Sequence, residues 1–221
     1  MTPLTIAVLG SGPVGRALAG AFSGLGHAVV LGTRDPATTT ARPEHASWST
    51  DHPTVRTSTF ADAVVGCDLV VNASGGDVTL AVLGLADLDR LDGTVLLDVS
   101  NPLDHSQGFP PRLSVSNDDS LGEQVQRAHP RLRVVKSLNT MNNAVMADPR
   151  RLGSSTTVFV SGDDADAKAL VTDLLTALGH DDVVDLGDIT TARGPEMWLA
   201  LWVRTAVALG TSDFNLKVVR A

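Results

Sequence analysis

Residues 4–15 read LTIAVLGSGPVG, an apolar run from Leu4 to Leu9 followed by glycines at positions 10, 12 and 15. A helical stretch over residues 16–26 comes next, so the glycines stand between a predicted strand and a predicted helix. In that setting the first glycine permits a tight turn, the second lets the backbone approach a pyrophosphate, and the third lets the helix pack on the strand. The stretch predicts a dinucleotide site whose loop contacts are Gly10, Ser11, Gly12, Pro13, Val14 and Gly15.

The end of a second apolar strand, Ala28 to Leu31, indicates which nicotinamide cofactor binds. Enzymes that use NAD usually carry an acidic residue there, which accepts hydrogen bonds from the ribose 2′-hydroxyl. This chain has Thr33 and Arg34, and a guanidinium offers a planar fork of donors to a 2′-phosphate. Asp35 lies one or two residues after the position of the usual acidic residue, and it precedes Pro36, which is typical of a turn. The prediction is NADP. NAD, and Arg34 as a solvated loop charge, stay open as alternatives.

Composition is typical of a globular protein with one substantial core and room for a small appended domain, given 221 residues of which 43% are hydrophobic. No apolar run approaches the ~20 residues of a membrane span, and no leader pattern precedes the first strand, so we expect a cytoplasmic protein with no membrane partner. A net charge of −8 with scattered Lys and Arg argues against a nucleic-acid partner. Cys67, the single cysteine, is predicted to be a buried, unreactive residue.

Strand and helix patterns alternate along most of the chain, which predicts an α/β fold: a Rossmann-type doubly wound parallel sheet with a small C-terminal α/β extension. The strand candidates are Leu4–Leu9, Ala28–Leu31, Asp68–Val71, Thr94–Val99, Leu132–Val135, Thr156–Val160 and Asp182–Asp185. The helical patterns are Val14–Leu25, Val78–Leu85, Leu121–Ala128, Asp164–Leu178 and a last one from Gly194 to Leu209. We assign residues 1–140 to an NADP-binding domain and 141–221 to an acceptor-pocket segment. Polar, proline-bearing residues 35–53 and 101–119 are predicted surface loops.

Small or amide-bearing side chains follow several of the predicted strands. Ligands of such sheets bind beyond the carboxyl ends of the strands, where amides and hydroxyls can bond ribose and a carboxamide without adding charge. The predicted cofactor contacts of this kind are Asn72, Ser74, Asn101, Asn139, Thr140 and Asn143. Each asparagine has the alternative role of capping a loop, since asparagine favours turns in any case.

Several common catalytic patterns are missing from the sequence. There is no Ser-His-Asp arrangement, no tyrosine for a Tyr-Lys pair, and no HExxH or paired-cysteine metal spacing. His45 and His52, on either side of Trp48, are predicted to be surface or turn histidines. We therefore expect no catalytic acid or base and no metal. Hydride transfer between two ring cofactors fits this, because it needs chiefly proximity, alignment and exclusion of water.

Segments spread over nearly the whole chain resemble the NADPH-dependent reductases of coenzyme F420, a deazaflavin, and their wider NADP oxidoreductase family. The matching segments are residues 10–19, 26–34, 135–140, 160–165, the pair 192–193 with Glu196, and 214–219. The resemblance implies that Ser11 to Val14 and Thr33-Arg34 hold NADP, that Met141 lies against the nicotinamide, and that the C-terminal part covers the second ring. It further implies coenzyme F420 as the redox partner and a homodimer.

We therefore predict an NADP-dependent oxidoreductase that transfers a hydride between NADPH and a small-molecule redox partner, coenzyme F420. One alternative is an NADPH-dependent reductase of a small carbonyl or imine substrate, like the hydroxyacid dehydrogenases and imine reductases, although the chain after residue 140 is short for their long helical dimerisation domain. The other is an NADP(H)-binding redox sensor without turnover. NADPH oxidation in the presence of F420 or of carbonyl compounds separates the three.

Overall fold

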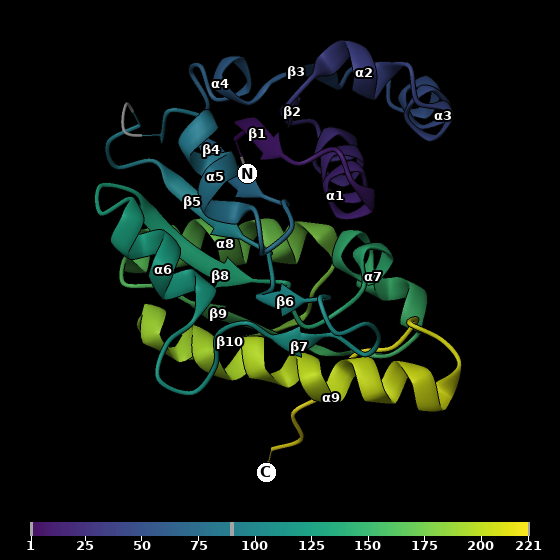
Figure 1. Cartoon of the computed structure of the whole chain (residues 1–221), viewed down its shortest axis with the longest axis vertical. Coiled ribbons are helices and arrows are strands. Elements are labelled where there is room, and N and C mark those ends of the chain that lie inside the picture. Colours follow the sequence, from purple (N-terminus) through teal and green to yellow (C-terminus); the bar gives the residue numbers. More distant parts are fainter. Residues whose placement is uncertain (1, 89–90, 221) are drawn as a thin grey trace.

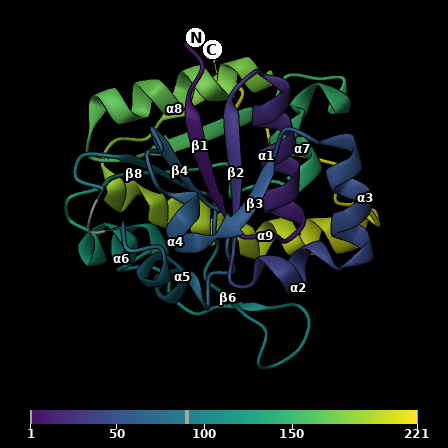
Figure 2. The same cartoon turned by 90° about the horizontal axis from the view of Figure 1, so that it is seen from above.

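The computed structural model describes residues 2–88 and 91–220. In these residues helices pack on both faces of an eight-stranded sheet, whose strand order is β10-β9-β8-β5-β4-β1-β2-β3 (Figure 1; Figure 2). The pairing is parallel from β8 through to β3 and between β9 and β10, as predicted. Only the pairing of β8 with β9 is antiparallel, so β9 and β10 run against the other strands. The predicted Rossmann-type fold class is confirmed, with this reversal at one edge.

The elements agree with the predicted strands and helices to within two residues at each end, and several short elements were not predicted. The strands of the large sheet are β1 (Thr5–Leu9), β2 (Ala28–Thr33), β3 (Arg56–Thr59), β4 (Leu69–Asn72), β5 (Val95–Asp98), β8 (Arg133–Ser137), β9 (Thr157–Ser161) and β10 (Asp182–Asp185), and β6 (Leu103–Asp104) and β7 (Arg112–Leu113) form a hairpin. The helices are α1 (Pro13–Gly24), α2 (Pro36–Thr40), α3 (Pro43–Asp51), α4 (Phe60–Ala63), α5 (Thr79–Leu85), α6 (Leu121–Ala128), α7 (Asn143–Ala147), α8 (Ala165–Leu178) and α9 (Arg193–Leu209), with 3-10 turns η2 (Pro149–Leu152) and η3 (Ile189–Ala192).

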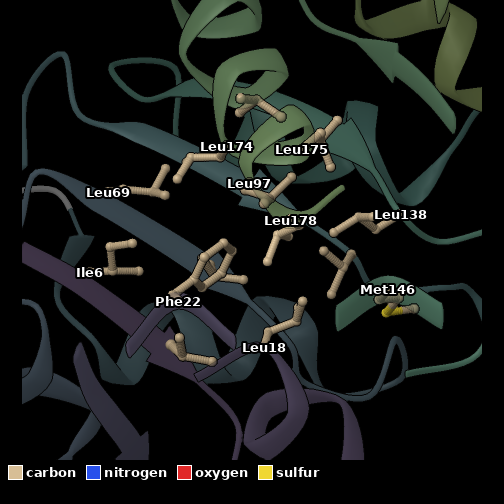
Figure 3. Close-up of a cluster of buried hydrophobic side chains, with 14 of the residues drawn as sticks. Ile6, Leu18, Phe22, Leu69, Leu97, Leu138, Met146, Leu174, Leu175 and Leu178 are labelled. Carbon is tan, nitrogen blue, oxygen red and sulfur yellow. The ribbon is translucent and has the colours of Figure 1, made fainter. Parts of the chain in front are cut away.

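Two hydrophobic cores lie on the two faces of the sheet. Alternate residues of β1 enter different cores: Ile6 and Val8 face α1, α7 and α8, whereas Ala7 and Leu9 face α4, α5 and α6. Figure 3 shows the first core, where Phe22 of α1 meets leucines of α8. Because both faces are covered, the central strands are apolar throughout, which is why the apolar runs predicted them well.

The segment 35–53 is helical, so its prediction as a surface loop is wrong. α2 and α3 begin at Pro36 and Pro43, and proline suits a first helical turn because its missing N–H would have no partner there. Asp35 caps α2 by accepting hydrogen bonds from the Thr38 N–H at 3.0 Å and the Thr38 hydroxyl at 2.6 Å. These bonds lower the pKa of Asp35, and they commit its carboxylate to the helix.

The prediction of a surface or turn histidine is also wrong for His45, which is only 1% exposed. Its Nε2 lies 3.1 Å from the Thr57 hydroxyl of β3. Its ring lies 5.4 Å from Trp48, which in turn lies 5.0 Å from His52. Burial lowers the pKa of His45. The three rings fall at positions three or four apart, the spacing of one helix face, and the His45–Thr57 contact joins this face to β3.

Residues after 140 continue the large sheet, since β9 and β10 extend it beyond β8. The chain that follows α9 then returns toward the sheet: the Thr157 N–H donates to the Leu216 carbonyl at 2.9 Å. Phe214 stacks on Trp202 of α9 at 5.4 Å, and Asn142 donates to the Asp213 carboxylate at 3.0 Å. The domain boundary at residue 140 stays a prediction.

A buried ionic cluster joins β5, β8, α9 and α6. The Lys136 ammonium lies 2.9 Å from Asp98 Oδ2 and 2.8 Å from Glu196 Oε1, and it donates to the Ser100 carbonyl at 2.6 Å. The three charged side chains are at most 2% exposed. Glu196 also accepts the first two N–H groups of α6 at 2.8 and 3.0 Å. One ammonium and one helix terminus thus compensate two buried carboxylates.

The protonation of Lys136 is coupled to folding. Burial alone would lower the pKa of Lys136, but the carboxylates of Asp98 and Glu196 outweigh it, and the pKa rises above its ordinary value of 10.5. A raised pKa in the folded state means that this stabilisation is fully present below about pH 10.5 and is lost as the pH rises through the folded-state value.

Replacing Lys136 by methionine should lower the free energy of unfolding by about 3–5 kcal/mol, because two buried carboxylates lose their counter-charge. Arg150→Met is the control, since Arg150 and Asp148 form an exposed pair at 2.7 Å whose loss should cost at most about 1 kcal/mol. Denaturant unfolding of both variants measures the difference. Equal losses of unfolding free energy in the two variants would contradict a major contribution of the buried cluster to stability.

Candidate functional site

The three glycines of the loop between β1 and α1 have different surroundings. Gly10 has φ +124°, and a Cβ there would lie 2.5 Å from the Ala73 carbonyl oxygen. A Cβ on Gly15 would lie 1.7 Å from the carbonyl oxygen of Gly10. At Gly12 an added Cβ would meet nothing within 4 Å. The fold therefore requires the first and third glycines, whereas Gly12 faces open space at the start of α1, where no side chain caps the helix.

Hydroxyl and guanidinium groups gather where β1 and β2 end. The Thr33 hydroxyl lies 3.3 Å from that of Ser11 and 2.8 Å from that of Thr39. Arg16 donates to the Ser11 carbonyl at 2.9 Å, and Arg34 is exposed, with no hydrogen-bond or ion-pair partner among the described residues. Because Asp35 is committed to α2, these groups offer donors suited to an anion. Arg16 and Thr39 were not among the predicted site residues, because only the geometry of α1 and α2 brings them to this corner.

Asn72, at the end of β4, is completely buried. Its Nδ2 donates to Asp98 Oδ1 at 2.8 Å, and its Oδ1 accepts from the Ser74 hydroxyl at 2.6 Å. Its amide thus supports the loop that carries Ser74 and links that loop to the ionic cluster. A direct contact of Asn72 with the cofactor remains a prediction.

The loops after β5 and β8 hold each other through two asparagines. Asn101 Nδ2 donates to the Asn139 carbonyl at 2.8 Å, and Asn139 Nδ2 donates to Asn101 Oδ1 at 2.9 Å. Leu138, just before this pair, has φ +62°, a left-handed conformation that is uncommon for leucine. A Cβ on Gly76 would lie 1.8 Å from the Asn101 carbonyl oxygen, so the loop after β4 packs on the same pair. Backbone strain at a ligand-facing edge is typical of functional sites.

A cavity of about 360 Å³ lies between these loops and α9. It is lined by the predicted contacts Val14, Ser74, Asn101, Asn139, Met141 and Asn143, and by Ala73, Gly75, Gly76, Asp77, Val99, Ser100, Leu103, His105, Asn142, Met146, Leu199, Trp202 and Val203. The other predicted contacts, Gly10, Ser11, Gly12, Pro13, Gly15, Thr33, Arg34, Asn72 and Thr140, lie outside its lining. Those of the glycine loop and the end of β2 form the separate corner described above.

Met141 and Thr140 differ in their surroundings. Met141 is 4% exposed and belongs both to the cavity wall and to the core that contains α1 and α8. Thr140 is buried, and no hydrogen-bond partner of its hydroxyl is found among the described residues. A packing role and a cofactor-facing role are thus both compatible with Met141.

A second cavity, of about 580 Å³, adjoins the first and shares Gly76, Asp77, Leu103 and His105 with it. We call these four residues the neck. Neither the neck histidine nor the α9 wall, which consists of Leu199, Trp202 and Val203, was among the predicted site residues. The three- and four-residue spacing of the α9 wall marks one helix face in the sequence, but nothing local shows which loops that face meets.

Other chemistries find little support in residues 2–88 and 91–220. No group of three His, Cys, Asp or Glu side chains in these ranges could hold a metal ion. Burial raises the pKa of Cys67 to about 11, which disfavours a reactive thiolate. Nor does any helix in these ranges have the length and apolar character needed to cross a membrane.

Comparison with known proteins identifies the family. A family model described as NADP oxidoreductase, coenzyme F420-dependent, matches residues 5–102. A crystal structure from Arthrobacter sp. FB24, provisionally named an F420-dependent NADP reductase, is 54% identical, with a TM-score of 0.96 and coverage of 98% of this chain and 100% of that one. This chain belongs to the coenzyme F420-dependent NADP oxidoreductase family. It is an oxidoreductase of a family that uses NADP.

More distant relatives share part of this picture. Metalloreductase STEAP3 of Rattus norvegicus is 30% identical over an alignment of 212 residues that covers 93% of this chain and 39% of STEAP3. The chain therefore spans well under half of that relative's length. An imine reductase from Myxococcus stipitatus is 18% identical with a TM-score of 0.62, covering 95% of this chain and 63% of that one, and it shows a shared fold.

Gly12→Val should abolish NADPH binding and leave the fold intact, because its Cβ meets no protein atom within 4 Å while it blocks approach to the α1 N-terminus. Gly15→Val is the contrasting variant and should unfold at a lower temperature, since its Cβ collides with the Gly10 carbonyl at 1.7 Å. Thermal unfolding with and without NADPH separates the two effects. A Gly12→Val protein that NADPH still stabilises as strongly as wild type would refute the assignment.

Proposed function

We propose that this protein transfers a hydride between NADPH and the deazaflavin coenzyme F420. The main support is the cavity at the nicotinamide end of the predicted NADP site, which has apolar and amide walls and is large enough for part of a second ring. The 54% identity to the Arthrobacter protein named for this reaction extends along the whole chain. Both observations fit ring-to-ring transfer, which depends chiefly on alignment and exclusion of water.

NADP would lie across the carboxyl ends of the parallel strands. The 2′-phosphate would meet Thr33 and Arg34 at the end of β2, with Ser11 and Arg16 beside them. The pyrophosphate would meet the open backbone at Gly12 and the N-terminus of α1. In the strand order β8-β5-β4-β1-β2, β4 lies on the opposite side of β1 from β2. A cofactor whose 2′-phosphate lies at β2 would therefore place its nicotinamide near β4 and the cavity.

The residues of this chain would position the reacting rings and exclude water. NADPH, when bound, supplies the hydride from its nicotinamide ring. Met141 and Val14 would pack beside that ring, and the reciprocal pair of Asn101 and Asn139 would fix the opposite wall. The apolar wall of α9 would cover the acceptor and keep water out of the cavity.

Absorbance changes on mixing the protein with NADPH and F420 test the proposed function. Loss of the deazaflavin and nicotinamide bands together is expected. Cyclic imines, small carbonyl compounds and a ferric chelate serve as other acceptors, the last because metalloreductase STEAP3 is 30% identical. If NADPH is oxidised with one of those compounds and not with F420, the acceptor belongs to the class of that compound and the proposal of F420 is wrong. Tight NADPH binding without any turnover would indicate a redox sensor.

Arg34→Ala should weaken NADPH binding and leave NADH binding nearly unchanged. Loss of a hydrogen bond to a charged group costs roughly 1.5–3 kcal/mol, which corresponds to a rise in Kd of about 10- to 150-fold. Arg42→Ala is the control, because Arg42 is also an exposed arginine of the segment after β2. The measurement is the dissociation constant of each cofactor. If the ratio of the NADPH and NADH dissociation constants is the same in Arg34→Ala as in wild type, Arg34 does not select NADP.

Met141→Ala should slow hydride transfer by about a hundredfold, because small misplacements of reacting atoms are costly. Val145→Ala is the packing control, since Val145 is buried in the same core but does not line the cavity. That variant should lose stability, by about 1–3 kcal/mol for the removed methyl groups, with an unchanged transfer rate per folded molecule. Single-turnover transfer from NADPH to F420, measured beside denaturant unfolding, distinguishes the roles. A lowered stability with an unaltered rate in Met141→Ala would remove Met141 from the site.

A further inference from the structure

The neck between the two cavities contains a histidine that the proposed function leaves unused. His105 follows β6 in the loop that leads to β7, and it lines both the 360 Å³ and the 580 Å³ cavity. No hydrogen bond of its imidazole is found among the described residues, and the residue is exposed. Its ring is therefore available to a molecule that occupies the cavities.

Only two titratable side chains line the smaller cavity within the described residues, and they are His105 and Asp77. As a residue type, histidine gains and loses a proton near neutral pH, whereas a carboxyl group is largely deprotonated there. Histidine is thus the better proton donor of the two types. The remaining polar groups of this wall are hydroxyls and amides, which are much weaker acids.

The position of the neck favours contact with the acceptor over contact with NADP. Val14 and Ala73, which adjoin the glycine loop, line only the smaller cavity. The larger cavity leads away from them, past Leu80 and Ser114. An acceptor ring that lies beyond the nicotinamide, with its remainder in the larger cavity, would pass through the neck beside His105.

We propose that His105 is the general acid of the reaction and gives a proton to a nitrogen of the acceptor as its ring is reduced. This inference rests on the proposed function.

The step is balanced with one proton from the protein. The C–H bond at the nicotinamide breaks, and its electron pair and hydrogen form a C–H bond on the acceptor, so NADPH is oxidised and the acceptor is reduced. The nitrogen conjugated with that carbon takes the proton from the imidazolium of His105, which regains a proton from solvent at the exposed neck. The same scheme serves a deazaflavin or an imine, since both gain a hydride on carbon and a proton on nitrogen.

Three charged residues accompany His105 in the neck and the hairpin. Asp77, in the loop after β4, lines both cavities together with His105, and Asp104 of β6 directly precedes it. Arg112 of β7 pairs with Asp104 in the register of the hairpin. The pKa of Asp104 is lowered, chiefly by hydrogen bonds from Ser106, so its negative charge is maintained beside the histidine.

His105→Gln tests the assignment, because glutamine keeps a polar amide of similar size but does not titrate. The expected result is a fall of about a hundredfold in kcat for reduction of F420 by NADPH, with the NADPH Kd unchanged. Wild-type kcat should decline as the pH rises through the imidazole range, and that decline should be missing from the variant. His52→Gln is the matched control, since His52 lines neither cavity and should give wild-type values for kcat and its pH profile. A His105→Gln enzyme with wild-type kcat and pH profile would overturn the proposal.

A binding measurement keeps this inference separate from the identity of the acceptor. If wild-type protein does not reduce F420, the proposed function fails, and His105 is then tested by nitrogen NMR of the histidine rings. The protein is saturated with NADP+ and titrated with 5-deazariboflavin as the probe. The His105 ring signals should shift with the probe and the His52 signals should not. Unmoved His105 signals would overturn its place beside the acceptor.

Discussion

A single buried ammonium group organises the ligand-facing edge of this protein. Lys136 cannot be buried without counter-charges, and it meets them in Asp98 of β5 and Glu196 of α9. Asp98 in turn accepts from Asn72 at 2.8 Å and from the Ser100 hydroxyl at 2.7 Å, so the charge reaches the loops after β4 and β5. The electrostatic need to pair one cation therefore ties these two loops and α9 together at the cavity.

The ionic cluster of Lys136, Asp98 and Glu196 supports the loops around the cavity, but none of these three residues lines it. Two carboxylates oppose one ammonium, and the remaining negative charge of Glu196 is met by the first N–H groups of α6. The same end of α6 is tied to α9 again, because Arg193 forms two hydrogen bonds with Glu123 at 2.8 and 2.6 Å. Apart from Asp77 and His105 at the neck, the cavity has amide, hydroxyl and apolar walls, which suit flat, largely neutral rings.

Local sequence signals predicted the parts of the fold that depend on local interactions. The apolar strands and the glycine turn follow from periodicity and from the needs of a tight turn, and the structure has both. The helices at 36–51 were not predicted because their composition is as polar as that of a surface loop; the local signals for them are Pro36, Pro43 and the ring spacing from His45 to His52. The reversal of β9 was missed because it depends on how the chain crosses the sheet, which periodicity does not report.

The proposed acceptor side was the least predictable part, for a physical reason. The proposed NADP corner is built by residues close in sequence to β1 and β2. The neck and the α9 wall instead bring together the loop after β4, the β6–β7 hairpin and a helix about 100 residues later. No local pattern encodes such a junction. The two halves also have different direct contacts: the glycine loop packs on Ala73, whereas the α9 wall is tied to the sheet by the Lys136–Glu196 pair. Under the proposed function, substitutions in the hairpin or along α9 alter which acceptor fits without disturbing how NADP binds, so the family resemblance constrains the cofactor more tightly than the acceptor.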